Sequence, residues 1–271
     1  RIGALGDIIL STPLIRAIRQ SCPKSKIYYL ADTTYREALT GNPYLNEVIY
    51  IDRGKMKKEK TWRRWVSELA FLNSLRAYHF DLIIDLVATP RSALMTLVTG
   101  APYRAGPNYR VRKLAFNYRY YDLDKEQYVA DFNLNLAAVV GIKPQTHDLD
   151  FYGHIPEEKF AREYLTKYNL VNRPLVGLNP GGTWPAKQWP NERWAAFTRY
   201  FQTTDYTPVL IASVREKEIV SAINQSLAKP VHIIQNLTLG QVAAVMKSMK
   251  VIVTNDSGLR FIAIALKIPT V

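Results

Sequence analysis

Short apolar runs alternate with longer amphipathic stretches along the first half of the chain. The pattern predicts strands at residues 26–30, 48–51 and 81–86, and it predicts helices at 62–78 and 91–99. Strands that alternate with helices are typical of βαβ units, in which the strands form a parallel sheet. The first half is therefore expected to fold as one α/β unit.

The same alternation restarts near residue 175 and continues to the end of the chain. It predicts a second α/β unit with its own parallel sheet. The strands are predicted at 175–178, 209–212, 231–234 and 251–253, and the helices at 191–201, 216–227, 239–249 and 258–266.

The region between the two halves has a different character. Residues 106–130 are rich in Arg and Tyr and lack a period, which predicts a long loop with a short hairpin. A helix is predicted at 131–140, and 143–156 has mixed composition and two prolines, as expected of a linker. We therefore expect two Rossmann-like domains that face a central cleft, residues 1–152 and 153–271.

The bulk composition excludes several classes of protein. With 271 residues and 48% hydrophobic content, the chain is long enough to bury a sizeable core. It has no uncharged apolar run of ~18 residues, so no segment is a candidate to span a membrane. The single cysteine, Cys22, excludes an intrachain disulfide framework and fits a reducing compartment. The chain begins at Arg1 in an apolar run and ends at Val271 in a predicted strand, so we expect both ends to be cuts through structure.

The formal net charge of +13 favours anionic partners, among them nucleic acid, phosphate-rich lipid headgroups and nucleotides. The positive charge is concentrated in two stretches. The first, here named the basic segment, holds seven basic residues against one acid, Glu59. Its basic residues are Arg53, Lys55, Lys57, Lys58, Lys60, Arg63 and Arg64, and the second stretch holds Arg104, Arg110, Arg112, Lys113 and Arg119. Each stretch is either a solvated loop or a surface that binds an anion.

Two glycines precede a helical stretch at the start of the chain, in Gly3-Ala4-Leu5-Gly6-Asp7. A glycine turn at a helix N-terminus lets a ligand approach the backbone closely. Asp7 would stand at the mouth of the cleft, where a carboxylate can accept a proton from an attacking hydroxyl. The alternative is that Asp7 is a helix N-cap. The spacing is not the Gly-x-Gly-x-x-Gly of dinucleotide-binding folds, which disfavours a nicotinamide dehydrogenase.

A second glycine-rich segment, residues 179–190, follows a predicted strand and precedes a predicted helix. Loops at the carboxyl ends of strands are where open α/β sheets bind ligands. Within the segment, Thr183 offers a hydroxyl and Lys187 offers a point charge that suits a phosphate. The alternative is a structural turn in which Trp189 packs as a core anchor.

A third segment, Val253-Thr254-Asn255-Asp256-Ser257-Gly258, ends a predicted strand and opens the last predicted helix. The N–H groups of the first helical turn, together with the helix dipole, favour a diphosphate at this position. The alternative is a motif that only caps the helix.

Taken in this order, the three segments resemble glycosyltransferase family 9, the ADP-heptose:lipopolysaccharide heptosyltransferases. The matching pieces are Arg1-Ile2-Gly3-Ala4-Leu5-Gly6-Asp7 with Thr12-Pro13, Pro180-Gly181-Gly182 with Lys187 and Trp189-Pro190, and Asn255-Asp256-Ser257-Gly258. The resemblance spans nearly the whole chain. It implies a GT-B fold in which the domain 1–152 binds the acceptor and the domain 153–271 binds the nucleotide sugar.

The resemblance also implies sugar transfer with inversion at the sugar carbon and without a metal ion or another cofactor. Asp7 would be the catalytic base, and Asp256 would stand at the donor site. The donor phosphates would be held by Thr183, Lys187 and the backbone around Ser257, Gly258 and Leu259. The histidines show no metal-ligand spacing. They are His79, His147, His154 and His232.

Two positions depart from the family pattern. Phe261 stands where a histidine is usual, and Arg260 stands where a smaller or apolar residue is usual. These departures leave open a catalytically altered or inactive member that still binds a nucleotide sugar. A basic nucleic-acid-binding protein is a more distant alternative, because no helix-turn-helix, zinc or RNA-recognition signature supports it. We expect no nucleic-acid partner.

The expected acceptor is the lipopolysaccharide core or another anionic glycolipid. Its candidate binding residues are Lys57, Lys58, Lys60, Arg63, Arg64, Arg110 and Arg112. We expect a cytoplasmic monomer that associates peripherally with the inner face of the inner membrane. Met56, Trp62 and Trp65 are the only candidates for shallow anchoring in the basic segment, so salt-sensitive association without insertion is predicted.

Overall fold

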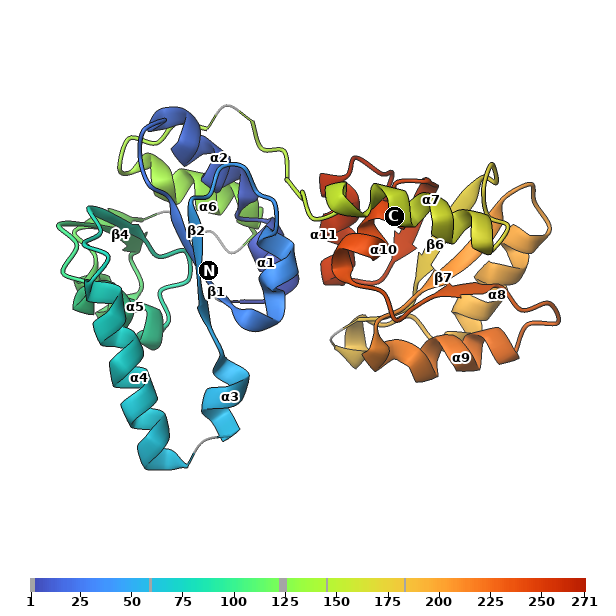
Figure 1. Cartoon of the computed structure of the whole chain (residues 1–271), viewed down its shortest axis with the longest axis horizontal. Coiled ribbons are helices and arrows are strands. Elements are labelled where there is room, and N and C mark those ends of the chain that lie inside the picture. The colour runs from blue at the N-terminus through green and yellow to red at the C-terminus, as the bar shows by residue number, and fades with distance from the viewer. Residues whose placement is uncertain (1–2, 59, 122–125, 145, 183) are drawn as a thin grey trace. The chain divides into compact units, whose positions relative to one another are not determined.

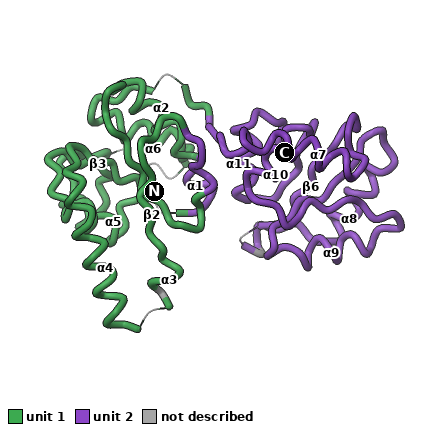
Figure 2. Tube along the Cα trace, in the orientation of Figure 1, with its two compact units in different colours: residues 1–3, 10–36, 43–148 green, residues 4–9, 37–42, 149–271 purple. Residues whose placement is uncertain are grey.

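The computed structural model describes residues 3–58, 60–121, 126–144, 146–182 and 184–271. Contacts within the chain separate two compact units, which Figure 2 shows in different colours. Unit 1 comprises residues 1–3, 10–36 and 43–148, and unit 2 comprises residues 4–9, 37–42 and 149–271. The main division, after residue 148, falls inside the stretch 143–156 that the sequence predicts as a linker.

Within the described residues, unit 1 contains two small parallel sheets. β1 (Tyr28–Asp32) pairs with β2 (Glu47–Ile51). In the second sheet β4 (Tyr103–Pro107) lies between β3 (Leu82–Ile84) and β5 (Tyr118–Tyr120). The helices are α2 (Thr12–Ser21), α3 (Arg53–Lys58), α4 (Thr61–Arg76), α5 (Pro90–Val98) and α6 (Val129–Ala138), with the 3-10 helices η1 (Thr33–Leu39) and η2 (Arg110–Ala115). The α/β prediction is confirmed (Figure 1).

Two apolar clusters hold the helices of unit 1 against its strands. One cluster joins α2 and α6 through Leu14 and Leu134, which are 4% and 1% exposed. The other joins α4 and α5 to β2 through Leu75, Met95 and Ile51. Because each helix buries only one face against a sheet, the opposite face of each is left to the surface.

The hairpin predicted within 106–130 is wrong. β5 runs parallel to β4, and η2 forms part of the connection between them. The physical reason is the aromatic ring of Phe116, which is 1% exposed and lies so close to Gly106 that a Cβ there would approach it to 2.6 Å. This packing draws the connection back over the sheet, which a two-stranded antiparallel hairpin does not require.

The loop interpretation of the basic segment is also wrong, because most of it is helical. Its first part forms α3, and its last residues form the first turn of α4. The Asp52 carboxylate accepts the N–H of Lys55 at 2.7 Å, as an N-cap does, and the Arg53 guanidinium pairs with the buried Asp32 carboxylate at 2.8 Å. These two contacts anchor the start of α3 to unit 1.

Within the described residues, unit 2 contains one parallel sheet in the strand order β8-β7-β6-β9. The strands are β6 (Leu175–Asn179), β7 (Thr207–Ile211), β8 (His232–Ile234) and β9 (Met249–Thr254). The helices are α1 (Leu5–Ile9), α7 (Glu158–Lys167), α8 (Asn191–Gln202), α9 (Lys217–Gln225), α10 (Leu239–Met246) and α11 (Gly258–Ala265), with the 3-10 helices η3 (Ile155–Glu157), η4 (Pro185–Lys187) and η5 (Val214–Glu216). Every residue of β6 is buried, as expected of a central strand covered on both faces.

Candidate functional site

The carboxyl ends of the strands in unit 2 are tied together by Asn179, the last residue of β6, which is 3% exposed. Its side-chain Nδ2 donates to the carbonyl of Ile211 in β7 at 2.9 Å. Its Oδ1 accepts from the hydroxyls of Thr254 and Ser257, at 2.9 and 3.0 Å. A side chain that bonds to the ends of two neighbouring strands, β7 and β9, and to the N-cap residue of α11 fixes the starting points of the loops that leave this edge.

The glycine-rich segment is held against the end of β9 by Asn255. The Asn255 side-chain Nδ2 donates to the carbonyl of Pro180 at 2.7 Å, and its Oδ1 accepts the N–H of Trp189 at 3.2 Å. Within the segment, Gln188 Nε2 donates to the carbonyl of Gly182 at 2.7 Å. The second and third sequence segments therefore form one structure at the same edge of the sheet.

Asp256 lies between two cations at this edge. Its Oδ2 pairs with Lys187 Nζ at 2.5 Å, and its Oδ1 pairs with an Arg260 guanidinium nitrogen at 3.0 Å. The hydrogen bond from Lys187 lowers the pKa of Asp256 below its ordinary value, and the charges of Arg260 and Lys187 add to the effect. Two cations against one carboxylate leave a net positive charge, which suits a phosphate ligand.

The first turn of α11 adds backbone donors to this positive cluster. Ser257 is the N-cap residue, but its hydroxyl bonds to Asn179 and makes no side-chain cap to α11. Gly258 and Leu259 are the first residues of α11. A helix N-terminus without a side-chain cap presents backbone N–H groups and a partial positive charge to an anion.

The N-terminal motif reaches the same part of unit 2 through contacts between α1 and α11. A Cβ on Gly258 would lie 2.9 Å from Leu5 Cβ, and a Cβ on Gly6 would lie 2.7 Å from the Phe261 ring. Asp7 stands in the first turn of α1 as its third residue, so the N-cap alternative is wrong. The structure thus brings the helix that carries the candidate base against the helix that begins the candidate phosphate site.

Several residues that build this site have no assigned role in the sequence interpretation. Asn179 and Asn255 hold the loops, and Glu216 packs so tightly on Gly181 that a Cβ there would lie 1.8 Å from its Oε1. The available signal for Glu216 is the Ser-x-x-Glu spacing from Ser213, and the structure forms that capping box. Thr183, a candidate phosphate ligand, lies outside the described residues.

The alternative for this segment, a structural turn in which Trp189 packs as a core anchor, is only partly confirmed. It is 43% exposed and meets Trp194 edge-on, with ring centroids 5.6 Å apart. Trp194 itself is 1% exposed and belongs to the core cluster of unit 2. The segment therefore combines a structural attachment with an accessible loop.

The candidate acceptor residues all belong to unit 1. Lys57 and Lys58 lie in α3, although the Lys57 side chain is outside the described atoms. Lys60 is the N-cap residue of α4, and its side chain is exposed, as are those of Arg63 and Arg64 in the first turn. Arg110 and Arg112 lie in η2, where the Arg112 guanidinium stands 5.5 Å from the Tyr109 ring centroid.

Arg104 and Arg119, from the second basic stretch, serve the fold. Arg104 donates to the carbonyls of Ala101 and Ala115, at 2.5 and 2.9 Å. Arg119 donates through Nε to the carbonyl of Phe116 at 3.0 Å. Because these guanidinium groups hold the β4–β5 connection in place, they are poorly placed to bind an acceptor.

Within the described residues, no group of three or more His, Cys, Asp or Glu side chains is arranged to hold a metal ion. No helix in that part of the chain combines the length and the apolar character needed to cross a membrane.

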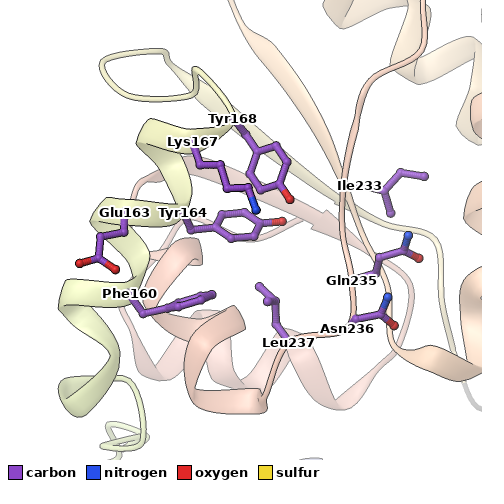
Figure 3. A pocket seen from close by; sticks show the side chains of 9 residues that line it. All are labelled: Phe160, Glu163, Tyr164, Lys167, Tyr168, Ile233, Gln235, Asn236 and Leu237. Carbon is purple, nitrogen blue, oxygen red and sulfur yellow. The ribbon is translucent and has the colours of Figure 1, made fainter.

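A separate open pocket lies along the edge strand β8 of unit 2, between that strand and α7 (Figure 3). Tyr164 Oη and His232 Nε2 are 2.8 Å apart, and the Tyr168 ring packs over His232. Burial raises the pKa of Tyr164 to about 12 and lowers the pKa of His232. The pocket contains none of the candidate donor-binding residues. Its lining comprises Phe160, Glu163, Tyr164, Lys167, Tyr168, Ile233, Gln235, Asn236 and Leu237.

The chain is similar to known proteins along almost its whole length. The profile of Glycosyltransferase family 9 (heptosyltransferase) matches residues 68–271. Lipopolysaccharide heptosyltransferase 2 of Escherichia coli strain K12 is 28% identical over 279 residues, covering 98% of this chain and 79% of that protein.

Solved structures agree with this relationship. The glycosyltransferase family 9 crystal structure from Veillonella parvula has a TM-score of 0.87 at 24% identity, covering 100% of this chain and 77% of that one. The Escherichia coli ADP-heptose lipopolysaccharide heptosyltransferase II has a TM-score of 0.78 at 26% identity, covering 99% and 82%. The fold is GT-B, and the chain belongs to glycosyltransferase family 9, a family of heptosyltransferases.

Proposed function

We propose that this glycosyltransferase moves a heptose from ADP-heptose to the lipopolysaccharide core or to another anionic glycolipid. The similarity to the Escherichia coli ADP-heptose lipopolysaccharide heptosyltransferase II supports this choice of donor and acceptor. The structural observation that carries the proposal is the pairing of Asp256 with Lys187 and Arg260 beside the N-terminus of α11. A net positive cluster next to helix-start N–H groups suits a nucleotide diphosphate.

In the proposed donor complex, Lys187 exchanges part of its contact with Asp256 for the donor diphosphate. The pair is exposed, with 54% of the Lys187 side chain and 38% of the Asp256 side chain accessible. An exposed ion pair contributes only ~0–1 kcal/mol, so a phosphate can compete for the ammonium at little cost. The Thr183 hydroxyl and the backbone around Ser257, Gly258 and Leu259 complete the proposed phosphate contacts.

In the proposed reaction, the Asp7 carboxylate accepts the proton of an acceptor hydroxyl. The acceptor oxygen forms a bond to the anomeric carbon from the face opposite the diphosphate, while the bond between that carbon and the diphosphate oxygen breaks. A single displacement from the opposite face inverts the configuration of the carbon. The electron pair of the broken bond stays on the ADP product, where Lys187 and the helix-start N–H groups stabilise its negative charge.

This mechanism needs no divalent metal, because side-chain cations and backbone donors face the charge that develops on ADP. Unit 1 is proposed to bind the acceptor through Lys57, Lys58, Lys60, Arg63, Arg64, Arg110 and Arg112. Unit 2 is proposed to bind the donor. The enzyme would act as a monomer at the cytoplasmic face of the inner membrane, where its anionic acceptor lies.

Thermal unfolding in the presence of ADP, UDP and GDP tests the proposed donor class. A ligand that binds only the folded chain at ~100 times its Kd stabilises it by ~2.7 kcal/mol. We expect ADP and ADP-heptose to raise Tm more than the uridine and guanosine diphosphates do. A larger shift with UDP or GDP would reject ADP-heptose as the donor while keeping the site in unit 2, and no shift with any nucleotide would reject the site.

A further inference from the structure

The helix α4 carries four large apolar side chains on the face that points away from the rest of unit 1. Trp62, Trp65, Val66 and Leu69 are 62%, 66%, 57% and 62% exposed. Their spacing of three and four residues places them in one stripe along the first half of the helix. We name these four side chains the apolar stripe.

The orientation of α4 is fixed by its opposite face. Leu72 and Leu75 are buried in the cluster with Met95 of α5. The only acid of α4, Glu68, pairs through both carboxylate oxygens with Arg91 of α5, at 2.6 and 2.5 Å. A bidentate ion pair and a packed apolar face together hold the helix in this rotation, so the apolar stripe is held outward.

Basic side chains flank the apolar stripe at the N-terminal end of α4, a position at which positive charge does not stabilise a helix. Arg63 and Arg64 lie in the first turn of α4, which contains no acid. The helix dipole disfavours positive charge in that turn. In the described part of the chain, no ion pair involves Lys58, Lys60, Arg63 or Arg64. The Arg63 guanidinium stands 5.3 Å from the Trp62 ring centroid, so charge and aromatic surface are adjacent.

Within unit 1, α3 and the first half of α4 extend beyond the sheets and the other helices (Figure 1). We infer that this end of unit 1 docks on an anionic phospholipid bilayer, with the apolar stripe inserted shallowly among the acyl chains and the flanking cations at the headgroups. Tryptophan favours the membrane–water interface, and basic side chains favour anionic headgroups. This membrane contact extends the proposed function, in which the acceptor is itself lipid-linked.

The inferred insertion differs from the sequence-based expectation of association by charge alone. Met56, one of the three anchoring candidates, is partly buried against Arg91, whereas Val66 and Leu69 join the two tryptophans. With 16 residues, α4 is too short to span a bilayer and would lie at its surface. Charge-driven binding is screened by salt, whereas burial of apolar side chains is not.

Co-sedimentation with vesicles, without donor or acceptor, separates the two contributions. The vesicles would contain phosphatidylcholine alone or mixed with phosphatidylglycerol, at ~0.05 M and ~0.5 M salt. We expect the full chain to bind the anionic vesicles and to retain part of that binding at high salt. A stripe variant, with Trp62→Ser, Trp65→Ser, Val66→Ser and Leu69→Ser, should lose binding by at least about tenfold and lose the salt-resistant part entirely.

Two further variants show whether vesicle binding depends on the basic side chains, on the apolar stripe or on exposed apolar surface in general. A charge variant, with Lys57→Gln, Lys58→Gln and Lys60→Gln, should bind less at low salt but keep the salt-resistant part. A control variant, with Val171→Ser and Tyr200→Ser, removes exposed apolar side chains from unit 2 and should bind as the parent chain does. Equal Tm values and equal ADP binding would establish that the variants are folded and that the donor site is unaffected.

Quenching of tryptophan fluorescence by brominated lipid measures the insertion itself. Bromine placed near the headgroup end of the acyl chain should quench the parent chain but not a Trp62→Phe, Trp65→Phe variant. Equal vesicle binding by the stripe variant and the parent chain would overturn the inference, as would absence of quenching. Concentration-dependent dimers that the stripe variant loses, without vesicle binding, would also overturn it by assigning the stripe to a second copy of the chain. If the parent chain binds vesicles as expected but does not bind ADP, that result would count against the proposed function and would not affect the inferred membrane contact.

Discussion

Asp7 is the residue on which the proposed chemistry depends most. Replacement by Asn keeps the size and polarity of the side chain but removes the proton-accepting carboxylate. We expect Asp7→Asn to lower kcat by ~10²–10⁴-fold, the usual contribution of a general base. Donor affinity should change little, because the proposed phosphate contacts involve other residues.

Steady-state rates and ADP titrations on the same preparations measure both quantities. Asp205→Asn is the matched control, since Asp205 is an exposed aspartate elsewhere in unit 2. Turnover by Asp7→Asn close to that of the control would remove Asp7 from the catalytic role.

Lys187 is the side chain expected to contribute most to binding of the diphosphate. Lys187→Ala should weaken ADP binding by ~1.5–3 kcal/mol, the range for a hydrogen bond to a charged group. The variant also leaves the Asp256 carboxylate with Arg260 as its remaining ion-pair partner. That exposed negative charge would oppose a phosphate as well.

Isothermal titration with ADP is the measurement, and Lys229→Ala is the matched control, because Lys229 is an exposed lysine of unit 2. If Lys187→Ala and Lys229→Ala bind ADP equally well, the ammonium of Lys187 does not contact the donor.

Some of the contacts in the candidate donor site can be predicted from the sequence. Lys187 and Asp256 follow the carboxyl ends of strands that are predicted to be parallel, so their meeting at one sheet edge is predictable. The hydrogen bonds of Asn179 and Asn255 are not predictable in this way, because they depend on side-chain orientation and on which strands are neighbours. Arg260 is visible as a departure from the family, but its pairing with Asp256 requires the geometry of the α11 turn.

At the scale of elements, the contact between α1 and α11 positions the helix that carries Asp7. Gly6→Ala would place a methyl group 2.7 Å from the Phe261 ring, so one of the two must move. We expect Gly6→Ala to lower kcat and Tm together. Adding Phe261→Ala should restore part of the lost turnover, because it removes the ring that the methyl group meets.

A double-mutant cycle with Gly6→Ala, Phe261→Ala and the combined variant measures this coupling. Strictly additive effects on kcat and Tm would mean that the two positions do not act through one contact.

The edge of unit 2 near β8 carries a pH-dependent element. Burial lowers the pKa of His232, so the folded chain binds this proton less readily than the unfolded chain does. Stability should therefore be complete above the ordinary pKa of about 6.5 and should fall as pH decreases below it. His154 should contribute to the same loss of stability at low pH, because burial and the charge of Lys247 lower its pKa.

Thermal unfolding between pH ~7.5 and ~5.5 tests this sign. We expect Tm to fall on acidification, and to fall less in His232→Gln, which keeps a polar group beside the Tyr164 hydroxyl. An identical decrease of Tm in the variant would show that other groups cause the acid sensitivity.

Element types were more predictable than the faces that the elements bury. The alternation of apolar runs located β2, β6, β7 and β9, because a buried parallel strand must be apolar on both faces. The periodicity also located the helix α4, but it did not indicate which face is buried, because α4 has apolar residues on two opposite faces and only one of them is buried. A periodicity says that a face is apolar and does not say what covers it. The packing of α1 on α11 could not be predicted from the periodicity either, because it joins segments at opposite ends of the chain.

At the scale of the whole molecule, the basic side chains that give the chain its net charge of +13 have different roles. Arg53, Arg104 and Arg119 bind groups within the fold, Lys187 and Arg260 surround the candidate donor site, and the remaining cations of the basic segment stand at the projecting end of unit 1. This division explains how one basic chain could serve an anionic donor and an anionic acceptor through separate surfaces.

The most direct test of the proposed reaction is acceptor-dependent release of ADP from ADP-heptose, with the mass of a heptose-deficient lipopolysaccharide acceptor followed in the same tube. The expected result is ADP release only when the acceptor is present, with the acceptor gaining one heptose, and with both signals lost in Asp7→Asn. If ADP raises Tm but no heptose reaches the acceptor, the chain binds the nucleotide without catalysing the transfer proposed here.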